Sequence, residues 1–150
     1  MSDRRLVLVQ PKDVPTIWHI VKPMIDKAIL DEWMTVEEIL KDILSKKNHL
    51  FVGIDGEKKI HMALVTEFVE YPNSKTLYIN TWATGTGYDF NIWYPFITVV
   101  DDFGRENGCT TIEATVRRGL AKKLKWKYQY TVCTRSLKQN GKEEKQEPRR

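Results

Sequence analysis

The residues with the clearest chemical potential form a short glycine loop, Thr84-Gly85-Thr86-Gly87. The segment before it, Lys75–Ala83, is rich in β-branched and aromatic residues, which is typical of a strand. The segment after it suits a helix that stops at Gly108, in the place where a left-handed residue is usually glycine. A glycine loop between a strand and a helix can offer backbone N–H groups and the positive end of the helix dipole to an anion. A plain tight connection has the same pattern, so both interpretations stay open.

Proton transfer near this loop would need a titratable group on the neighbouring strands. Leu77–Ala83 contains no acidic residue, and Glu67 and Glu70 on the preceding strand are the nearest candidates for a general base. The alternative is that both are solvated surface acids. The histidines show no spacing to other ligand types that is typical of a metal site, so no metal is expected.

A basic segment follows the last part of this region. Six basic residues and no acidic one lie between Arg117 and Lys127. Such a patch can meet a phosphate, a nucleic acid or an acidic protein surface, and a solvated helix face is the commoner alternative. The net charge of +4 over 150 residues is modest, and nucleic acid is not the favoured partner.

The elements that must position these residues follow the order β-α-α-β-β-β-α-β-α-β. The expected strands are Arg5–Gln10, His49–Ile54, Lys59–Phe68, Lys75–Ala83, Thr110–Val116 and Tyr128–Arg135. Helices are expected after Asp13, after Thr35, at Asn91–Asn107 and at Arg118–Lys125, with Thr35 and Glu38 forming a capping box. Residues 1–137 are predicted to form one domain, and residues 138–150 a polar, charged tail.

The helix expected at Asn91–Asn107 carries apolar side chains on more than one side. One stripe consists of Ile92, Phe96, Val99, Val100 and Phe103. Trp93 and Ile97 lie off this stripe, which predicts burial over more than half of the helix girth. Pro95 must lie in or near the first turn, so the helix is expected to start around Asn91.

This order of elements, with the glycine loop after the fourth strand, resembles the GNAT superfamily, the Gcn5-related N-acetyltransferases, from about Arg5 to Leu137. The resemblance implies an α/β (α+β) fold with a mixed, mainly antiparallel sheet of about six strands and helices on both faces. It also implies that acetyl-CoA lies where the fourth and fifth strands splay apart, with its pyrophosphate on the loop Thr84–Gly87. Arg117 or Arg118 would reach another CoA phosphate.

The sequence departs from the family's pattern at two places. The phosphate loop of the family usually reads Gln/Arg-x-x-Gly-x-Gly/Ala, and Trp82 stands at the first of these positions. Many members place a tyrosine in the helix after the fifth strand as a general acid, and Ala121 stands there in this chain. The runs Arg118–Trp126 and Asp13–Trp18 are similar to short phage-encoded GNAT-like proteins.

Two functions follow from these observations. The departures favour a phage-type protein with a degenerate acetyl-CoA site that acts as a virion-associated or assembly component with a protein partner. The alternative is an active N-acetyltransferase on an unknown amine, with Glu67, Glu70 or a water as base, which alone would require acetyl-CoA.

The expected location is the cytoplasm, or a virion if the protein is phage-encoded. No apolar run approaches the roughly 18–20 residues that span a bilayer, and no signal peptide is visible. Cys109 and Cys133 are expected to be small buried residues that suit a reducing compartment.

Overall fold

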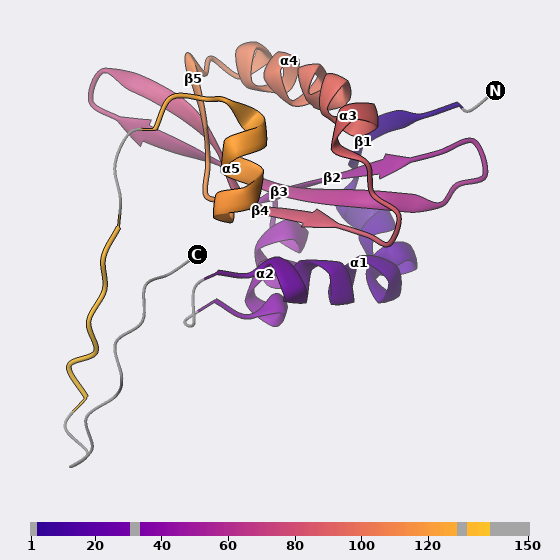
Figure 1. Cartoon of the computed structure of the whole chain (residues 1–150), viewed down its shortest axis with the longest axis horizontal. Coiled ribbons are helices and arrows are strands. Elements are labelled where there is room, and N and C mark those ends of the chain that lie inside the picture. The colour runs from indigo at the N-terminus through magenta and orange to yellow at the C-terminus, as the bar shows by residue number, and fades with distance from the viewer. Residues whose placement is uncertain (1–2, 31–33, 129–131, 139–150) are drawn as a thin grey trace. The chain divides into compact units, whose positions relative to one another are not determined.

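The computed structural model describes residues 3–30, 34–128 and 132–138, in two compact units, Met1–Val116 and Arg117–Arg150. Figure 1 shows the chain. The first unit contains β1 (Arg5–Val9), η1 (Pro11–Asp13), α1 (Val14–Ala28), α2 (Val36–Leu44), β2 (His49–Ile54), β3 (Ile60–Tyr71), β4 (Ser74–Thr84), α3 (Phe90–Trp93), η2 (Tyr94–Ile97), α4 (Thr98–Glu106) and β5 (Thr111–Ala114). The second unit contains α5 (Arg118–Leu124).

The sheet has the strand order β1-β2-β3-β4-β5, and its neighbours are antiparallel except for the parallel pair β4 and β5. Strand β4 pairs with β5 only over Thr76–Ile79, opposite Thr111–Ala114. On its other side β4 pairs with β3 along almost its full length, with one shift of register that leaves Asn80 as the extra residue of a β-bulge. The result is a mixed, mainly antiparallel sheet, as expected.

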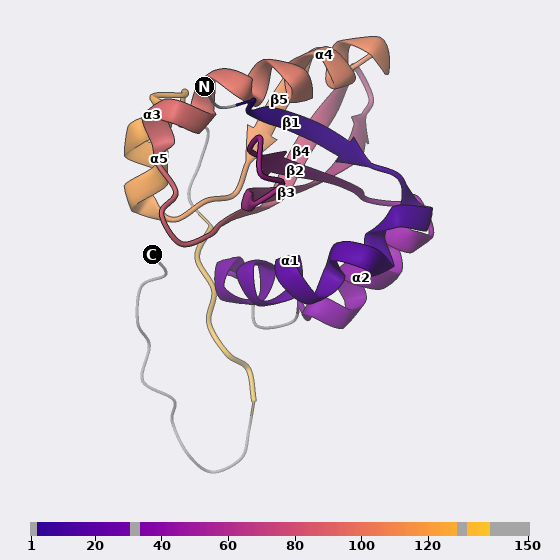
Figure 2. The same ribbon diagram turned by 90° about the vertical axis from the view of Figure 1, so that its right-hand side faces the viewer.

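Helices cover both faces of this sheet, with α1 and α2 on one face and α3 and α4 on the other (Figure 2). The α1–α2 face has a closed apolar core in which buried helix residues pack on alternate strand residues. Its members include Val21, Ile25, Ile39, Ile43, Leu50, Val52, Ala63 and Val65. The capping box predicts the start of α2 correctly, since the Thr35 hydroxyl accepts a hydrogen bond from the Glu38 N–H at 3.2 Å.

The expected helix Asn91–Asn107 is divided into α3, η2 and α4. Pro95 has no N–H to donate, and the tighter 3₁₀ turn at Tyr94–Ile97 shifts the phase of the following residues. As a result Trp93, Ile97 and Val100 are buried. Ile92 and Val99 are exposed, so their assignment to the core stripe was wrong.

The prediction of a strand at Tyr128–Arg135 is wrong for the part that the structure describes, since Tyr128 and residues 132–135 have no regular secondary structure. Residues 129–131 and the tail beyond 138 lie outside the described residues. Strand propensity reports the fit of side chains to a paired, half-buried surface, and without such pairing it does not fix a strand. Cys133 is exposed rather than buried, and Cys109 is half-buried. None of the described helices has the length and apolar character that crossing a membrane requires.

Candidate functional site

The two central strands separate at Asn80. Thr115 still donates its N–H to the Ile79 carbonyl at 3.2 Å, but β4 continues to Thr84 without pairing to β5. The Gly85 N–H donates to the His61 carbonyl of β3 at 2.8 Å. Because backbone groups alternate along a strand, the N–H of Thr84 points away from β3, to the side that β5 has left. This side of β4 is therefore an edge at which an extended molecule with amide groups can pair.

The glycine loop continues directly from this edge. The Tyr88 N–H donates to the Gly85 carbonyl at 3.2 Å, and with the bond from Gly85 to His61 this fixes the base of the loop. The described backbone hydrogen bonds include none from Thr86 or Gly87, so these N–H groups are the loop's candidate donors for an anion. Gly87 has φ +78°, and a Cβ built on it meets no atom within 4 Å. The tip of the loop is accordingly open.

The helix after the loop supports anion binding less than the sequence suggests. Helix α3 has only four residues, and the Asp89 carboxylate accepts the N–H of Asn91 at 2.9 Å. A negative charge therefore already occupies the positive end of this short helix. Anion binding here would depend on the loop rather than on a helix dipole.

Two aromatic residues, Trp82 and Tyr88, flank the loop in the sequence. Trp82 is 7% exposed and stands opposite Leu64, so its side chain is on the face that carries α3 and α4. Burial raises the pKa of the Tyr88 hydroxyl. The Tyr88 oxygen is inaccessible to solvent and has no acceptor for its proton among the described residues.

A polar group lies on the opposite face, at the point of strand separation. The Asn80 amide donates to the Glu67 carboxylate at 2.8 Å, and the Thr81 hydroxyl donates to the Asn80 side-chain oxygen at 3.0 Å. Tyr78 stands opposite Glu67, and its hydroxyl is hydrogen-bonded to the Thr115 hydroxyl. This places a carboxylate and a phenol on the same face beside the gap between β4 and β5.

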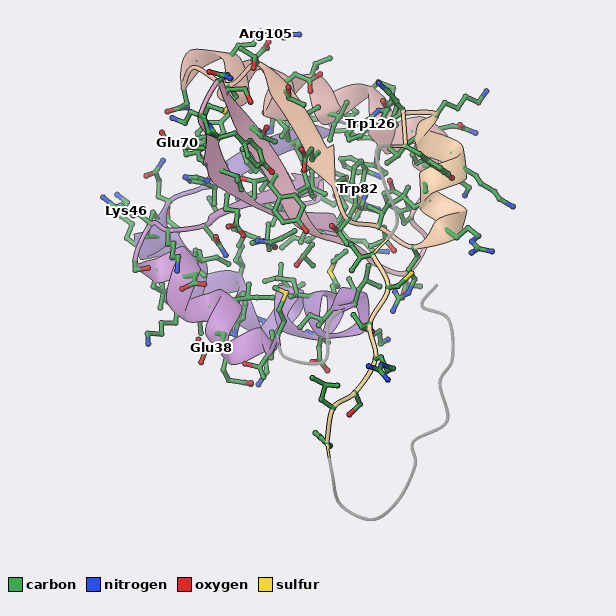
Figure 3. The ribbon with its side chains drawn as sticks, turned by 90° about the vertical axis from the view of Figure 1, so that its left-hand side faces the viewer. Glu38, Lys46, Glu70, Trp82, Arg105 and Trp126 are labelled. Atoms are coloured by element: carbon green, nitrogen blue, oxygen red, sulfur yellow. The ribbon has the colours of Figure 1, made fainter. Side chains whose placement is uncertain are left out.

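Glu67 and Glu70, the two candidate acids from the sequence, lie in different places in the structure. Glu67 is half-buried beside Asn80, whereas Glu70 is exposed opposite Lys75 near the β3–β4 turn. Glu70 and Trp82 lie towards opposite ends of this strand pair (Figure 3). Glu70 is therefore too far along the sheet to serve the loop, and Glu67 is the better-placed acid.

The sequence did not single out Asn80, Tyr78 and Thr115 as members of the polar group around Glu67. Asn80 was detectable, because asparagine is disfavoured inside a strand and often marks an irregularity. Tyr78 and Thr115 depend on the register between β4 and β5, which the sequence does not give. Arg117 and Arg118 belong to the second unit, as N-cap and first residue of α5, and their role toward a phosphate stays a prediction.

His49 and His61 make structural contacts. The His61 Nε2 is 2.8 Å from the Asp55 carboxylate, and the ring stacks on Trp93 with centroids 5.1 Å apart. Burial lowers the pKa of His49, which packs against Phe68 and Phe103. Among the described residues no three His, Cys, Asp or Glu side chains are grouped so that they could hold a metal ion.

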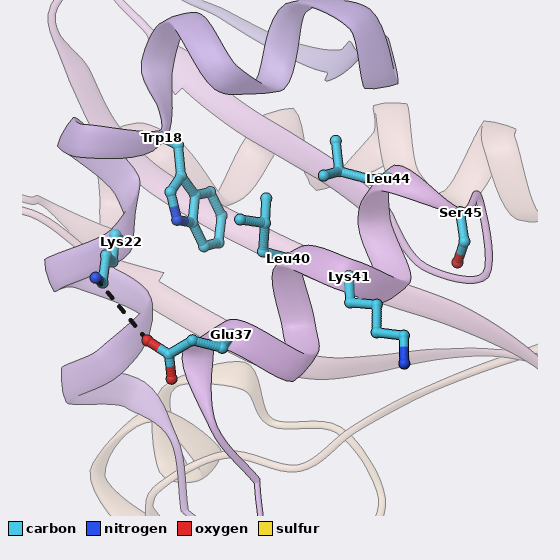
Figure 4. A pocket seen from close by; sticks show the side chains of 7 residues that line it. All are labelled: Trp18, Lys22, Glu37, Leu40, Lys41, Leu44 and Ser45. Atoms are coloured by element: carbon cyan, nitrogen blue, oxygen red, sulfur yellow. Dashed lines mark ion pairs between the residues drawn. The ribbon is translucent and has the colours of Figure 1, made fainter.

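A separate open groove lies between α1 and α2 (Figure 4). Trp18, Leu40 and Leu44 form its apolar part, and Lys22, Glu37, Lys41 and Ser45 complete it. The Lys22 ammonium and the Glu37 carboxylate are 3.9 Å apart, and both side chains are mostly exposed. Such a pair contributes little to stability.

Comparison with solved structures identifies the fold. An aminoglycoside acetyltransferase from an uncultured soil metagenomic sample, in complex with sisomicin, superimposes with a TM-score of 0.67 and 17% identity, covering 90% of this chain and 97% of that chain. A ribosomal-protein-alanine N-acetyltransferase from Brucella melitensis biovar Abortus 2308 gives a TM-score of 0.66 and 10% identity, covering 89% and 99%. A transcriptional regulator from Bacillus halodurans C-125 gives 0.63 and 17%, covering 89% and 99%.

The chain therefore has the GNAT fold, as the order of its elements and its glycine loop predicted. No protein-family model and no curated protein matches the sequence. At these identities the likeness shows the fold, and the function must be argued from the site.

Proposed function

We propose that this chain is an acetyl-CoA-dependent N-acetyltransferase. The observation that carries the proposal is the separation of β4 from β5 at Asn80, with Glu67 and Tyr78 beside the gap. The sequence alone favours the non-catalytic alternative, because a general acid and a general base are missing from the family's usual positions. Glu67 on β3 and Tyr78 on β4 are candidates for these two roles, and we therefore favour the catalytic function.

The backbone near the gap fits the donor molecule. The pantetheine arm of acetyl-CoA contains amides that can pair with the edge of β4 at Thr84, as an added strand would. The N–H groups of Thr86 and Gly87 can receive the pyrophosphate at the open tip of the loop.

Acetyl-CoA supplies a thioester whose carbonyl carbon an amine can attack. Glu67 would accept the proton that the amine nitrogen loses as the nitrogen–carbon bond forms. The Tyr78 hydroxyl would give its proton to the sulfur as the carbon–sulfur bond breaks, and Thr115 would orient that hydroxyl. Solvent then takes the proton from Glu67 and returns one to Tyr78, so the reaction is balanced.

The test is release of free CoA thiol from acetyl-CoA in the presence of a panel of amines. The panel contains polyamines, aminoglycosides and peptides with free lysine or N-terminal amines. We expect Glu67→Gln and Tyr78→Phe each to lower kcat by about 10²–10⁴-fold, the usual range for general acids and bases. Glu70→Gln is the matched control and should leave kcat unchanged. Equal rates for Glu67→Gln and Glu70→Gln would reject the assigned base.

A second candidate function is a non-catalytic interaction component with a protein partner, of the virion-associated kind that the sequence resembles. Three observations favour it: the Gly85 N–H is engaged by His61, Asp89 occupies the start of α3, and Ala121 stands where a general acid is usual. This candidate predicts no heat on titration with acetyl-CoA and no thiol release with any amine. A partner captured in pull-down, with binding unaffected by Glu67→Gln, would support it.

A further inference from the structure

Asn80 and Thr81 are consecutive residues of β4 whose side chains are hydrogen-bonded to each other. In a regular strand, consecutive side chains point to opposite faces of the sheet and do not meet. The β-bulge at Asn80 changes this, because the extra residue re-aims the side chains of the bulged strand. The Asn80 side chain consequently contacts both Thr81 and Glu67 of the neighbouring strand β3.

The Thr81 hydroxyl determines which end of the Asn80 amide faces Glu67. Thr81 is 1% exposed, and its hydroxyl donates to the Asn80 Oδ1 at 3.0 Å. Because an amide oxygen can only accept, this bond holds Oδ1 towards Thr81. The Asn80 Nδ2 is left facing Glu67 and donates to its Oε2 at 2.8 Å. With the amide reversed, Oδ1 would face an ionised carboxylate that has no proton to donate.

The bond from Asn80 engages one oxygen of the Glu67 carboxylate, which is half-buried. A hydrogen bond to an ionised group is stronger than one between neutral groups. An ionised carboxylate has acceptor positions on both oxygens, so the Glu67 Oε1 remains able to take a proton. Glutamate has a long and flexible side chain, and a base that is already held in place loses less freedom as the reaction proceeds.

We propose that Asn80 is a positioning residue for the general base Glu67, and that Thr81 acts through Asn80 by orienting its amide. The inference rests on the proposed function, since it assigns a role toward the base of that reaction. Asn80 takes no part in the proton transfer: it holds one carboxylate oxygen while the other accepts the proton of the amine. This role accounts for an asparagine inside a strand, where that residue type is disfavoured.

The experiment measures kcat and KM by release of CoA thiol from acetyl-CoA, with the amine of the panel that reacts fastest with the unaltered protein. For Asn80→Ala we expect kcat to fall about 10- to 100-fold, the effect of one lost hydrogen bond to a charged group, with the KM for acetyl-CoA unchanged. In a Glu67→Gln background, Asn80→Ala should lower kcat no further, because it acts only through that carboxylate.

Variants of Thr81 test the orientation of the amide. Thr81→Val removes the hydroxyl and should lower kcat about three- to tenfold, whereas Thr81→Ser keeps the hydroxyl and should retain kcat. Thr76→Val is the matched control, because Thr76 is an equally buried threonine of β4 that lies outside this hydrogen-bonded group. It should leave kcat unchanged.

An exchange variant separates catalysis from folding. Glu67→Gln combined with Asn80→Asp restores a hydrogen bond between an amide and a carboxylate in the opposite direction. We expect its urea midpoint to lie close to that of the unaltered protein, while kcat stays low because the carboxylate has left β3. Recovery of kcat would overturn the inference, since the position of the base would then not matter.

The remaining outcomes separate this inference from the proposed function. If the unaltered protein transfers acetyl groups and Asn80→Ala leaves kcat unchanged, the positioning role is overturned while the function stands. A further fall in kcat on adding Asn80→Ala to Glu67→Gln also overturns it, since Asn80 would then act without that carboxylate. Equal losses from Thr81→Val and Thr81→Ser would overturn the role of Thr81. If the unaltered protein releases no thiol with any amine, the proposed function fails and this inference fails with it.

Discussion

Substitution of Gly53 by alanine tests how α3 is held against the sheet. A Cβ built on Gly53 would lie 2.7 Å from Met62 Cγ and 2.9 Å from Trp93 Cζ3, closer than real Cβ contacts occur. In a strand with room for the Cβ, the same change would stabilise the fold by about 0.4–1 kcal/mol, because alanine lowers the conformational entropy of the unfolded chain. Overpacking of a filled core usually costs about 1–3 kcal/mol. We therefore expect Gly53→Ala to lower the free energy of unfolding by about 1–2 kcal/mol.

The assay is the urea midpoint followed by tryptophan fluorescence, to which Trp93 contributes as one of five tryptophans. Gly119→Ala is the control, because a Cβ there meets nothing within 4 Å and alanine favours the helix α5. In a Met62→Ala background the cost of Gly53→Ala should shrink, since one of the two obstructing side chains is then shortened. A midpoint for Gly53→Ala at or above that of the unaltered protein would refute the packing described for Trp93.

Two further predictions concern stability. Phe51→Ala should lower the free energy of unfolding by about 3–5 kcal/mol, because the ring is 1% exposed. Phe103→Ala should lower it by less, about 2–3 kcal/mol, because that ring is half-buried. Equal shifts of the urea midpoint for the two variants would contradict this difference. The pKa of Asp55 is lowered, chiefly by its hydrogen bond to His61, so the folded state binds fewer protons than the unfolded state as the pH falls. The stabilisation from this contact should be complete above a pH of about 4 and lost as the pH falls further. Asp55→Asn should therefore flatten the dependence of the free energy of unfolding on pH in this range. An unchanged pH dependence in this variant would show that Asp55 makes no such contribution.

The fold was predictable because several independent patterns agreed. The strand segments, the capping box at Thr35 and the glycine break after Ala83 each indicated one element, and their order indicated the arrangement. The division of the central helix was harder to predict. Pro95 is compatible with either a helix start or a 3₁₀ turn, and only the packing of Trp93 and Ile97 decides between them.

The site was predictable only in part, because the register between paired strands decides which of its side chains are neighbours on one face of the sheet. The sequence offered the loop Thr84–Gly87 and the acids Glu67 and Glu70 as candidates, and their roles stay predictions. The role of Tyr78 could not be ranked, since a one-residue shift of pairing would move its side chain to the other face of the sheet. The same limitation made Glu70 look equivalent to Glu67.

The most direct test of the central claim is calorimetric titration with acetyl-CoA. We expect binding with a dissociation constant in the micromolar range, and we expect Gly87→Glu to abolish it, because a carboxylate at the open tip of the loop repels the pyrophosphate. Gly108→Glu is the matched control, since Gly108 has a similar φ of +82° and open surroundings but lies beyond α4. The absence of binding heat with the unaltered protein, or equal binding of acetyl-CoA by both variants, would contradict an acetyl-CoA site at this loop.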